Sequence, residues 1–238
     1  MLFIGGISQG RKLLNYAKSI LCGSCGSTSQ CQVFMTYMYF SFFFIPLFKW
    51  NKRFYVQMSC CSAIYELEPE IGKAIELAGM EWLILDKTEK GYFAILNGFD
   101  GKERTFDSAS NNWILSKLRN ELNTRFLKKI TDEFGEDAVI EFDRDLLSLD
   151  GQTEYGHCKD KISMLTVDEY RKYRKFLPHM DKWWWLLTPW STPANGYSVT
   201  NSVVSPSGRI GSFSYYIVNG VRPVCNFPSS IFVSGNHY

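Results

Sequence analysis

The sequence predicts an α+β protein in two parts, a small strand-rich domain over residues 1–68 and a larger mixed domain over residues 80–238. Two observations predict this division. Five of the seven cysteines fall between residues 22 and 61, whereas four of the seven tryptophans fall between residues 183 and 190. Residues 69–79 predict a short helical linker, with Pro69 near its start, acidic residues in its first turn and Gly79 at its end.

The composition is that of an ordinary globular protein, with 45% hydrophobic and 21% charged residues. The formal net charge of +2 gives no general attraction to nucleic acid or anionic lipid, so such binding would need a local patch. The uneven spread of the cysteines is unlike a disulfide framework and indicates a metal site in a reducing compartment. Residues 1–10 lack a secretory signal, so we expect a cytoplasmic protein.

The longest apolar run covers residues 33–48 and contains Ser41 and Pro46. It is shorter than the roughly 20 apolar residues that a membrane-spanning helix needs. We therefore expect no membrane span.

Two cysteine groups flank strand-like segments in the first part. Cys22 and Cys25 form a Cys-x-x-Cys-Gly turn, in which two thiolates reach one ion while Gly26 permits the tight backbone. Residues 33–37 and 54–58 are rich in aromatic and β-branched residues and predict two strands that bring this turn close to Cys60 and Cys61. This is the plan of a zinc ribbon, and it predicts a tetrahedral structural zinc ion held by Cys22, Cys25, Cys60 and Cys61.

The adjacency of Cys60 and Cys61 leaves alternatives open, because neighbouring residues of a strand point to opposite faces. A local turn would let both ligate; otherwise Cys31 would replace one of them. Buried free thiols and a redox pair are the other interpretations of this cluster. With four protein ligands the metal site would be closed and would stabilise a small fold rather than activate water.

Residues 3–70 resemble a bacterial zinc-ribbon family of small proteins. The motifs that carry the resemblance are Phe3-Ile4-Gly5-Gly6, Cys22-x-x-Cys25-Gly26, the run from Tyr39 to Trp50 with its Phe-Ile-Pro element, and Tyr55-Val56-x-x-x-Cys60-Cys61. In that family the Phe-Ile-Pro element between the cysteine pairs is typical, so the resemblance argues against a membrane span over residues 33–48. The sequence departs from the family at the second cysteine pair, where Cys-x-x-Cys is usual.

The second part alternates strand and helix signals. Residues 82–85 and 92–96 predict a hairpin, and the polar residues 107–112 predict a cap for a helix over residues 113–127, whose apolar residues recur every four. Thr166 and Glu169 predict a capping box at the start of another helix. The acidic residues between 132 and 160 lack the spacing of a calcium loop, so we expect them in caps and turns.

The tryptophan-rich segment 183–190 predicts a central strand that is covered on both faces, with Pro189 at its end. A polar tract follows and runs to about residue 220. Residues 220–224 then predict a return strand.

Four motifs of the second part, in order, resemble a family of uncharacterised C-type-lectin-fold domains common in Firmicutes and their phages. They are Trp113-x-x-Ser116-x-Leu118-Arg119-x-x-Leu122-Asn123-x-x-Phe126, Leu165-Thr166-x-x-Glu169-Tyr170, Trp184-Trp185-Leu186-Leu187-Thr188-Pro189 and Gly220-Val221-Arg222-Pro223-Val224. Distant relatives of that fold are formylglycine-generating enzymes and the variable proteins of diversity-generating retroelements.

In those relatives the ligand surface lies between the tryptophan-rich strand and the Arg-Pro strand. The resemblance implies that the ligand-binding residues here are Trp190, Asn195, Tyr197, Asn201, Arg209, Tyr215 and Tyr216. Such side chains suit a recognition surface, although a solvated loop pair without a partner would have the same composition. We expect Arg222 to be structural and to pair with a buried carboxylate or with carbonyl groups.

Catalysis is not expected. His157, His179 and His237 show no triad order, and only Cys225 lies where formylglycine-generating relatives carry a cysteine pair. The sequence thus favours a non-catalytic recognition protein whose ligand is a protein or a glycan, ahead of a degenerate formylglycine-generating-like enzyme. An alternative is that the zinc ribbon binds nucleic acid or protein, with Lys49, Lys52 and Arg53 as the nucleic-acid contacts and the lectin-like domain as a scaffold.

Overall fold

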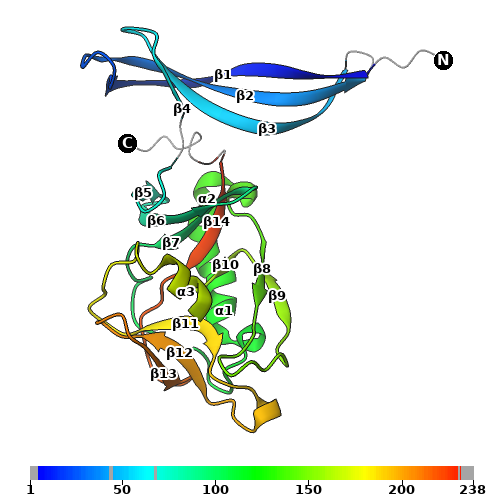
Figure 1. Ribbon diagram of the computed structural model, residues 1–238, viewed down its shortest axis with the longest axis vertical. Helices are drawn as coiled ribbons and strands as arrows, with labels where there is room; N and C mark the ends of the chain where they lie inside the picture. Colours follow the sequence, from blue (N-terminus) through cyan, green and yellow to red (C-terminus); the bar gives the residue numbers. More distant parts are fainter. Residues whose placement is uncertain (1–4, 43–44, 67–68, 230, 232–238) are drawn as a thin grey trace, which may run out of the picture. The chain divides into compact units, whose positions relative to one another are not determined.

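A computed structural model describes residues 5–42, 45–66, 69–229 and 231. The chain separates into two compact units, and the division falls between Pro69 and Glu70 and again after Pro228. Figure 1 shows both units and their strand and helix labels. The strand-rich structure with few helices agrees with the predicted α+β class.

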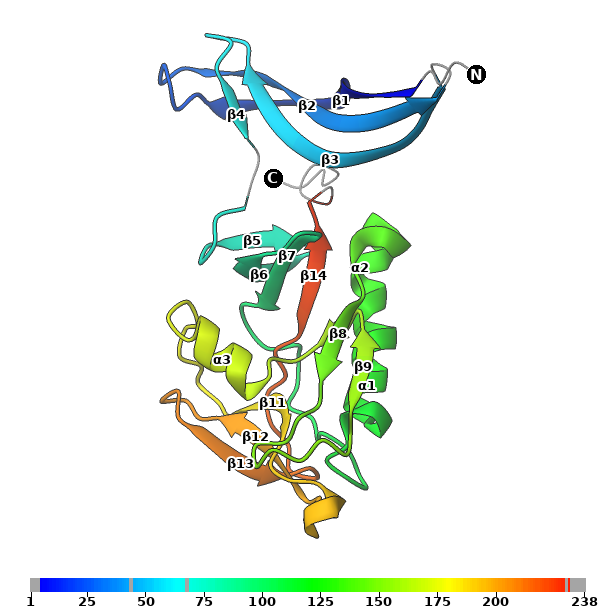
Figure 2. The same cartoon turned by 45° about the vertical axis from the view of Figure 1, so that its right-hand side comes forward.

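The first unit is a four-stranded antiparallel sheet in the order β1-β2-β3-β4. Its strands are β1 (Gly5–Leu21), β2 (Thr28–Phe42), β3 (Ile45–Met58) and β4 (Ile64–Glu66), and the first three are long ribbons in Figure 2. The predicted strands 33–37 and 54–58 lie within β2 and β3. Cys31 pairs with Met58 and Val33 pairs with Val56, so these four side chains share one face and pack with Cys22 as a small core.

The apolar run 33–48 lies in β2 and β3, apart from residues 43–44, which lie outside the described part of the chain. Wherever the structure describes the chain, no helix combines the length and the apolar character needed to cross a membrane.

The prediction of a helical linker over residues 69–79 is wrong. Ala74–Leu77 form a strand, β5, which pairs with β6 (Met80–Lys87) and belongs to the second unit. Leu77 pairs with Met80 across Ala78 and Gly79, whose φ angles are 54° and 62°. Two consecutive positive φ angles define the tight turn that suits the twist of a hairpin, so Gly79 serves a β-turn rather than a helix end. Local helix preference is overridden here by pairing with β6.

The second unit contains a five-stranded sheet in the order β10-β14-β7-β6-β5. Strands β6 and β7 (Gly91–Leu96) form the predicted hairpin, and β14 (Val224–Pro228) lies between β7 and the short β10 (Ile162–Ser163). Leu83, Leu85, Phe93, Ile95 and Val224 of this sheet are buried in one core cluster with side chains of α3 (Val167–Tyr173) and β11 (Trp184–Pro189).

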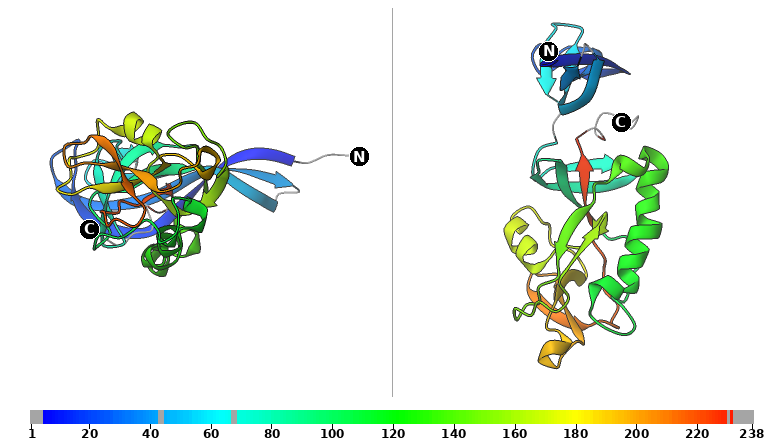
Figure 3. Two further views of the ribbon diagram at one scale, coloured as in Figure 1. Left: turned by 90° about the horizontal axis from the view of Figure 1, so that it is seen from below. Right: turned by 90° about the vertical axis from the view of Figure 1, so that its right-hand side faces the viewer.

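A helical stretch runs along one side of the second unit (Figure 3). It begins with the turn η1 (Trp113–Leu115) and continues as α1 (Lys117–Glu121), η2 (Leu122–Phe126) and α2 (Leu127–Phe134). Leu118, Leu122, Phe126 and Ile130 are all buried. The η2 segment is a π-helix, and its wider turn keeps a four-residue repeat on one face. The side chains of Asn112 and Ser116 cap η1 and α1, which confirms the predicted polar cap in part.

The predicted capping box is confirmed at α3. Thr166 accepts a hydrogen bond from the backbone of Glu169, and the Glu169 carboxylate accepts one from the backbone of Thr166. The acidic segment supplies β8 (Phe142–Asp145) and β9 (His157–Asp160), which pair as a separate two-stranded sheet. Asp160 is buried and accepts hydrogen bonds from Trp113 and Arg119.

The tryptophan-rich segment forms β11, in which all six residues are buried. It pairs with β12 (Thr200–Val204), which in turn pairs with β13 (Ile210–Ser214), and a single turn, η4 (Pro193–Asn195), lies in the intervening loop. Trp184 belongs to the core cluster shared with the five-stranded sheet, whereas the Trp185 ring packs edge-on against Phe106. The prediction of a strand covered on both faces is confirmed, but β11 is an edge strand of its three-stranded sheet rather than a central strand.

The predicted return strand starts later than expected, at Val224, because Pro223 cannot donate a hydrogen bond to a ladder. Arg222 is fully buried and its guanidinium lies 5.0 Å from the Trp184 ring. Its Nε donates to the carbonyl of Leu96, while its two terminal nitrogens have no partner among the described residues. Arg222 is therefore paired with a carbonyl group, which is one of the two kinds of partner predicted for it. Burial lowers the pKa of its guanidinium to about 10.

Candidate functional site

Two turns at one end of the first unit carry the cysteines. The turn between β1 and β2 is closed by hydrogen bonds between Cys22 and Ser27 and between Gly26 and Cys22, and Gly26 has a φ of 69°. The turn between β3 and β4 is closed by a hydrogen bond from Met58 to Ala63. Because Cys31 of β2 pairs with Met58 of β3, both turns leave the sheet side by side.

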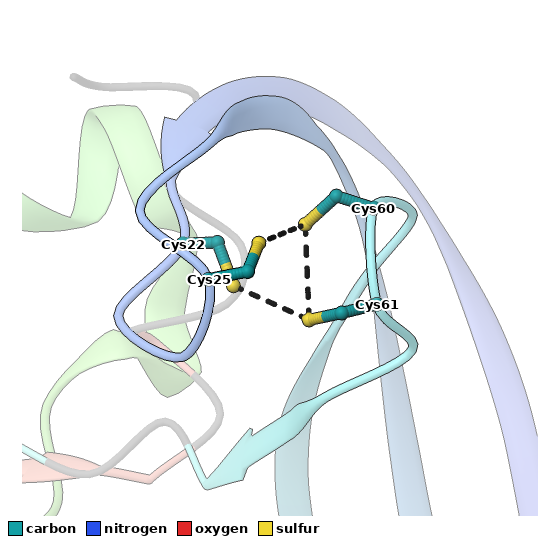
Figure 4. Close-up of side chains that lie close together, drawn as sticks. All are labelled: Cys22, Cys25, Cys60 and Cys61. Carbon is teal, nitrogen blue, oxygen red and sulfur yellow. Dashed lines mark hydrogen bonds between the residues drawn. The ribbon is translucent and has the colours of Figure 1, made fainter.

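The four sulfur atoms of Cys22, Cys25, Cys60 and Cys61 all lie within 4.8 Å of one another (Figure 4). The sulfur–sulfur distances are 3.3 Å for Cys25–Cys60, 3.5 Å for Cys22–Cys61 and 3.8 Å for Cys60–Cys61. Tetrahedral zinc with Zn–S bonds of about 2.3 Å requires sulfur atoms about 3.8 Å apart. The arrangement therefore fits one tetrahedral metal ion.

The structure decides between the two ways of completing this cluster. Cys60 and Cys61 lie in the turn after β3 rather than in an extended strand, so both side chains reach the same point (Figure 4). Cys31 lies in β2, is only 1% exposed and packs with Val33, Val56 and Met58 outside the cluster of four. Its position favours a role in the core beneath the turns.

The backbone of the first turn favours thiolates. The backbone N–H of Cys25 and, more weakly, the hydroxyl of Tyr65 lower the pKa of Cys22 to about 6. The backbone N–H of Ser27 and the thiol of Cys60 lower the pKa of Cys25. These two sulfurs are therefore prepared to bind a cation, since metals bind the thiolate form.

The thiol of Cys61 differs from those of Cys22 and Cys25. The backbone N–H of Ala63 lowers its pKa, but its contacts with Cys22, Cys60 and Cys25, together with burial, outweigh that hydrogen bond and raise the pKa to about 12. A cation at the centre of the cluster would reverse this balance, because it stabilises all four thiolates at once.

Tyr65 of β4 supports the first turn from outside the cluster. Its hydroxyl lies 2.7 Å from the Ser24 hydroxyl and 3.6 Å from the Cys22 sulfur. Polar groups in this position orient metal ligands and are as much a part of a metal site as the ligands themselves. Sequence reasoning did not identify Tyr65, since its distance from Cys22 along the chain hides the contact.

The predicted ligand-binding residues lie in the second unit, and the structure brings only some of them together. Trp190, Tyr197 and Tyr216 are 38%, 44% and 57% exposed, Asn195 is also exposed, and Tyr215 is half-buried with its ring 5.4 Å from that of Tyr216. Backbone hydrogen bonds from Trp190 to Thr200 and from Tyr215 to Val199 hold these segments at the Thr200 end of β12.

Two residues do not belong to this group. Asn201 is fully buried in β12, where it is opposite Phe213, so the prediction that it contacts a ligand is wrong. Its place in the middle strand of a three-stranded sheet explains the burial. Arg209 is exposed, but it precedes β13 at the turn near Val204, the opposite end of the hairpin from Tyr215.

Sequence reasoning missed two further features beside these aromatic residues. Val199, Ile217 and Val218 are 36%, 39% and 55% exposed, and the short apolar run after Tyr216 was the available signal. The carboxylate of Asp150 accepts hydrogen bonds from Ser148, Ser191 and Asn195, which lower its pKa to about 2. This carboxylate positions Asn195 next to the loop that carries Trp190.

Comparison with known proteins bears on the first unit and on the beginning of the second. A zinc-ribbon family model matches residues 20–104, a range that starts just before Cys22 and includes all four clustered cysteines. No curated protein and no solved structure matches the chain. The family match and the cysteine cluster together support a metal-binding structural or binding role for this part of the chain.

Proposed function

We propose that this protein is a non-catalytic recognition protein, in which a structural zinc ribbon accompanies a C-type-lectin-like domain that binds a protein or a glycan. The observation that carries the proposal is the group of four sulfur atoms within 4.8 Å on two turns that a zinc-ribbon family model covers. Four protein ligands leave no open position on zinc, so such an ion stabilises structure and does not activate water.

A zinc ion would contribute a large part of the stability of the first unit, because the described core of that unit is small. Among the side chains that the structure describes in the first unit, the buried cluster beneath the two turns consists of Cys22, Cys31, Val33, Val56 and Met58. So small a core contributes little, and small domains commonly depend on a metal for that reason. Because the ligands must stay reduced, a reducing compartment such as the cytoplasm suits this site.

The metal content of the purified chain tests the zinc assignment. We expect about one zinc ion per chain, and a Cys22→Ser variant should lose most of it. Cys158→Ser is the matched control, because Cys158 lies in β9 of the second unit and outside the cluster. A chain that purifies without zinc and takes up none when zinc is supplied would refute the assignment.

The recognition role rests on the residues we call the aromatic face: Trp190, Asn195, Tyr197, Tyr215 and Tyr216. Three of its aromatic side chains are exposed, and exposed aromatic groups beside amide and hydroxyl groups give rigid contact area with adaptable hydrogen bonding. The neighbouring exposed Val199 and Val218 extend it with apolar surface, a feature of binding sites. The lectin-like fold is proposed from the order of the four sequence motifs.

Binding to a glycan array or to surface proteins tests the aromatic face. A Trp190→Ala, Tyr216→Ala variant should lose binding at least about tenfold, because exposed aromatic anchors commonly dominate such contacts. Leu115→Ala is the control, since Leu115 is 74% exposed in η1. Equal loss in the control, or unchanged binding in the double variant, would exclude the face as the contact.

The absence of catalysis is also part of the proposal. Cys225, the residue nearest in position to the cysteines of formylglycine-generating relatives, is fully buried, and burial raises the pKa of its thiol well above the ordinary value. His179 is bonded to Arg174 and to the carbonyl of Pro206, and neither contact is a carboxylate that would orient a base. His237 lies outside the described residues.

The alternative of a nucleic-acid-binding ribbon has a distinct signature. Lys49, Lys52 and Arg53 belong to β3, but their side chains lie outside what the structure describes. Binding through them would weaken steeply with added salt as counterions are released. Salt-dependent binding to single- or double-stranded oligonucleotides, lost in a Lys49→Gln, Lys52→Gln variant, would favour this alternative over the aromatic face.

A further inference from the structure

The four-thiol cluster lies at the surface rather than in a closed core. Cys25, Cys60 and Cys61 are exposed, whereas Cys22 is only 1% exposed. Exposed thiolates are the ones that oxidants such as peroxides reach. The cluster is therefore open to chemical modification as well as to metal binding.

The geometry limits which disulfide bonds can form within the cluster. Adjacent Cα atoms across a trans peptide are about 3.8 Å apart, whereas disulfides usually join Cα atoms about 4.4–6.8 Å apart. A Cys60–Cys61 disulfide is therefore disfavoured. A Cys22–Cys25 disulfide would leave Cys60 and Cys61 without another cysteine of the cluster to pair with. Across the two turns, the sulfur atoms of Cys25 and Cys60 lie 3.3 Å apart and those of Cys22 and Cys61 lie 3.5 Å apart (Figure 4).

We propose that peroxide oxidation releases the metal ion and joins the two turns through a Cys22–Cys61 and a Cys25–Cys60 disulfide. In each pair one thiolate sulfur attacks a peroxide oxygen, the O–O bond breaks and hydroxide leaves. The second thiolate attacks the resulting sulfenic acid, the S–S bond forms and a second hydroxide leaves. The two sulfurs lose two electrons, both hydroxides take up protons to become water, and the zinc ion leaves as a dication.

The adjacent cysteines change what metal loss does to the fold. A ribbon with two Cys-x-x-Cys turns can close one disulfide within each turn, and the turns are then no longer connected. In this chain the disulfides connect the turns, and each closes a long loop from the turn after β1 to the turn after β3, which stabilises the folded state. Oxidation therefore releases the metal while the two turns stay together, whereas removal of the metal by a chelator leaves them unconnected.

The test uses the full chain loaded with zinc, treated with hydrogen peroxide, alkylated and digested for peptide mapping. We expect release of about one zinc ion per chain, measured with a chromogenic chelator, and cross-linked peptides that contain Cys22 with Cys61 and Cys25 with Cys60. Cys158→Ser should give the same products. The proposal fails if the mapped bonds are Cys22–Cys25 or Cys60–Cys61, if they join Cys22 to Cys60, or if the cysteines form sulfinic acids without disulfides.

A second measurement separates this proposal from the zinc assignment on which it rests. If the purified chain binds no zinc, the proposed function fails, but mild oxidation of the same metal-free chain with diamide still reads the pairing of the four cysteines. Protease resistance of residues 5–66 then distinguishes the two kinds of metal loss. The oxidised chain should stay resistant and the chelated, reduced chain should be cut; equal cutting of both would contradict the proposal.

Discussion

Whether Cys60 and Cys61 can both bind one metal ion depends on whether they lie in a strand or in a turn. In an extended strand their side chains would point to opposite faces, and only one of them would join Cys22 and Cys25. In the turn after β3 both reach the cluster, at 3.8 Å from each other. Spacing alone left this choice open between a turn and replacement by Cys31, because it depends on where β3 ends.

Asn201 and Arg222 show that the burial of a polar residue is hard to predict from the sequence alone. The sequence marks Asn201 as a polar residue in a polar tract, yet its position in the middle strand buries it completely. The expectation that Arg222 is structural agrees with its burial and with its hydrogen bond to the carbonyl of Leu96, whereas the contact of its guanidinium with the Trp184 ring was not predicted. Burial of a polar residue follows from strand order, which one sequence does not reveal.

The Arg144–Glu169 pair predicts a pH dependence of stability at the residue scale. Burial raises the pKa of Glu169, but two hydrogen bonds of 2.6 and 2.7 Å from Arg144 outweigh burial and hold the pKa below its usual value. A lowered pKa in the folded state means that this stabilisation is fully present above the unfolded pKa of about 4.3 and is lost as the pH falls through the folded pKa.

We therefore expect Glu169→Gln to flatten the fall in the free energy of unfolding below about pH 5, measured by urea titration with tryptophan fluorescence. At pH 7 the variant should be less stable by about 3 kcal/mol, because Arg144 is only 3% exposed and would keep an unpaired charge. Asp168→Asn is the control, since its pair with Arg171 is exposed. The same pH profile in wild type and Glu169→Gln would refute the account.

At the scale of elements, local sequence signals identified several strands and helices, but β1, β8, β9, β12 and β13 were not predicted as strands. The hairpin of β6 and β7, the covered strand β11 and the capping box of α3 were predicted, since each has a local signal. Residues 69–79 predict a helix because Pro69 lies near the start, acidic residues lie in the first turn and Gly79 lies at the end. In the Ala78-Gly79 turn, only Gly79 is a residue typical of a tight hairpin turn. Alanine rarely adopts a positive φ angle, so Ala78 gives no sequence signal for the turn.

Ala78→Gly separates the hairpin from the helix. At a φ of 54° glycine is free of the penalty that a Cβ carries, so the variant should raise the free energy of unfolding of the second unit by about 1 kcal/mol. In a helix the same change would lower it by about 0.5–1 kcal/mol. The sign of the change in the free energy of unfolding, measured by urea titration, therefore decides between a hairpin and a helix at this position. Gly98→Ala, at a position with no heavy atom within 4 Å of a new Cβ, shows the effect of an ordinary glycine change.

At the scale of the whole molecule, the two compact units should lose structure independently. Among the described side chains, the first has a small core and a cluster of four cysteines, whereas the second has a large core that joins two of its sheets through α3 and β11. The sequence predicted two parts from the separate clusters of cysteine and tryptophan. It did not reveal that residues 70–79 belong to the second unit, since the pairing of β5 with β6 is a tertiary feature.

A Cys22→Ser, Cys25→Ser variant tests this independence. Without two of four ligands the first unit should unfold, because metal binding and folding are coupled in small metal domains. The second unit should keep its cooperative unfolding transition, followed by the fluorescence of its buried tryptophans, within about 0.5 kcal/mol of the wild type. Limited proteolysis should cut only before about residue 70; collapse of both units would contradict two independent cores.

The central claim is that four cysteines hold one zinc ion, and X-ray absorption at the zinc edge measures the ligands directly. The geometry predicts a single shell of about four sulfur atoms at about 2.3 Å from zinc in the full-length chain. A shell that contains nitrogen or oxygen, fewer sulfur atoms, or no bound zinc in a chain with reduced cysteines would contradict the account.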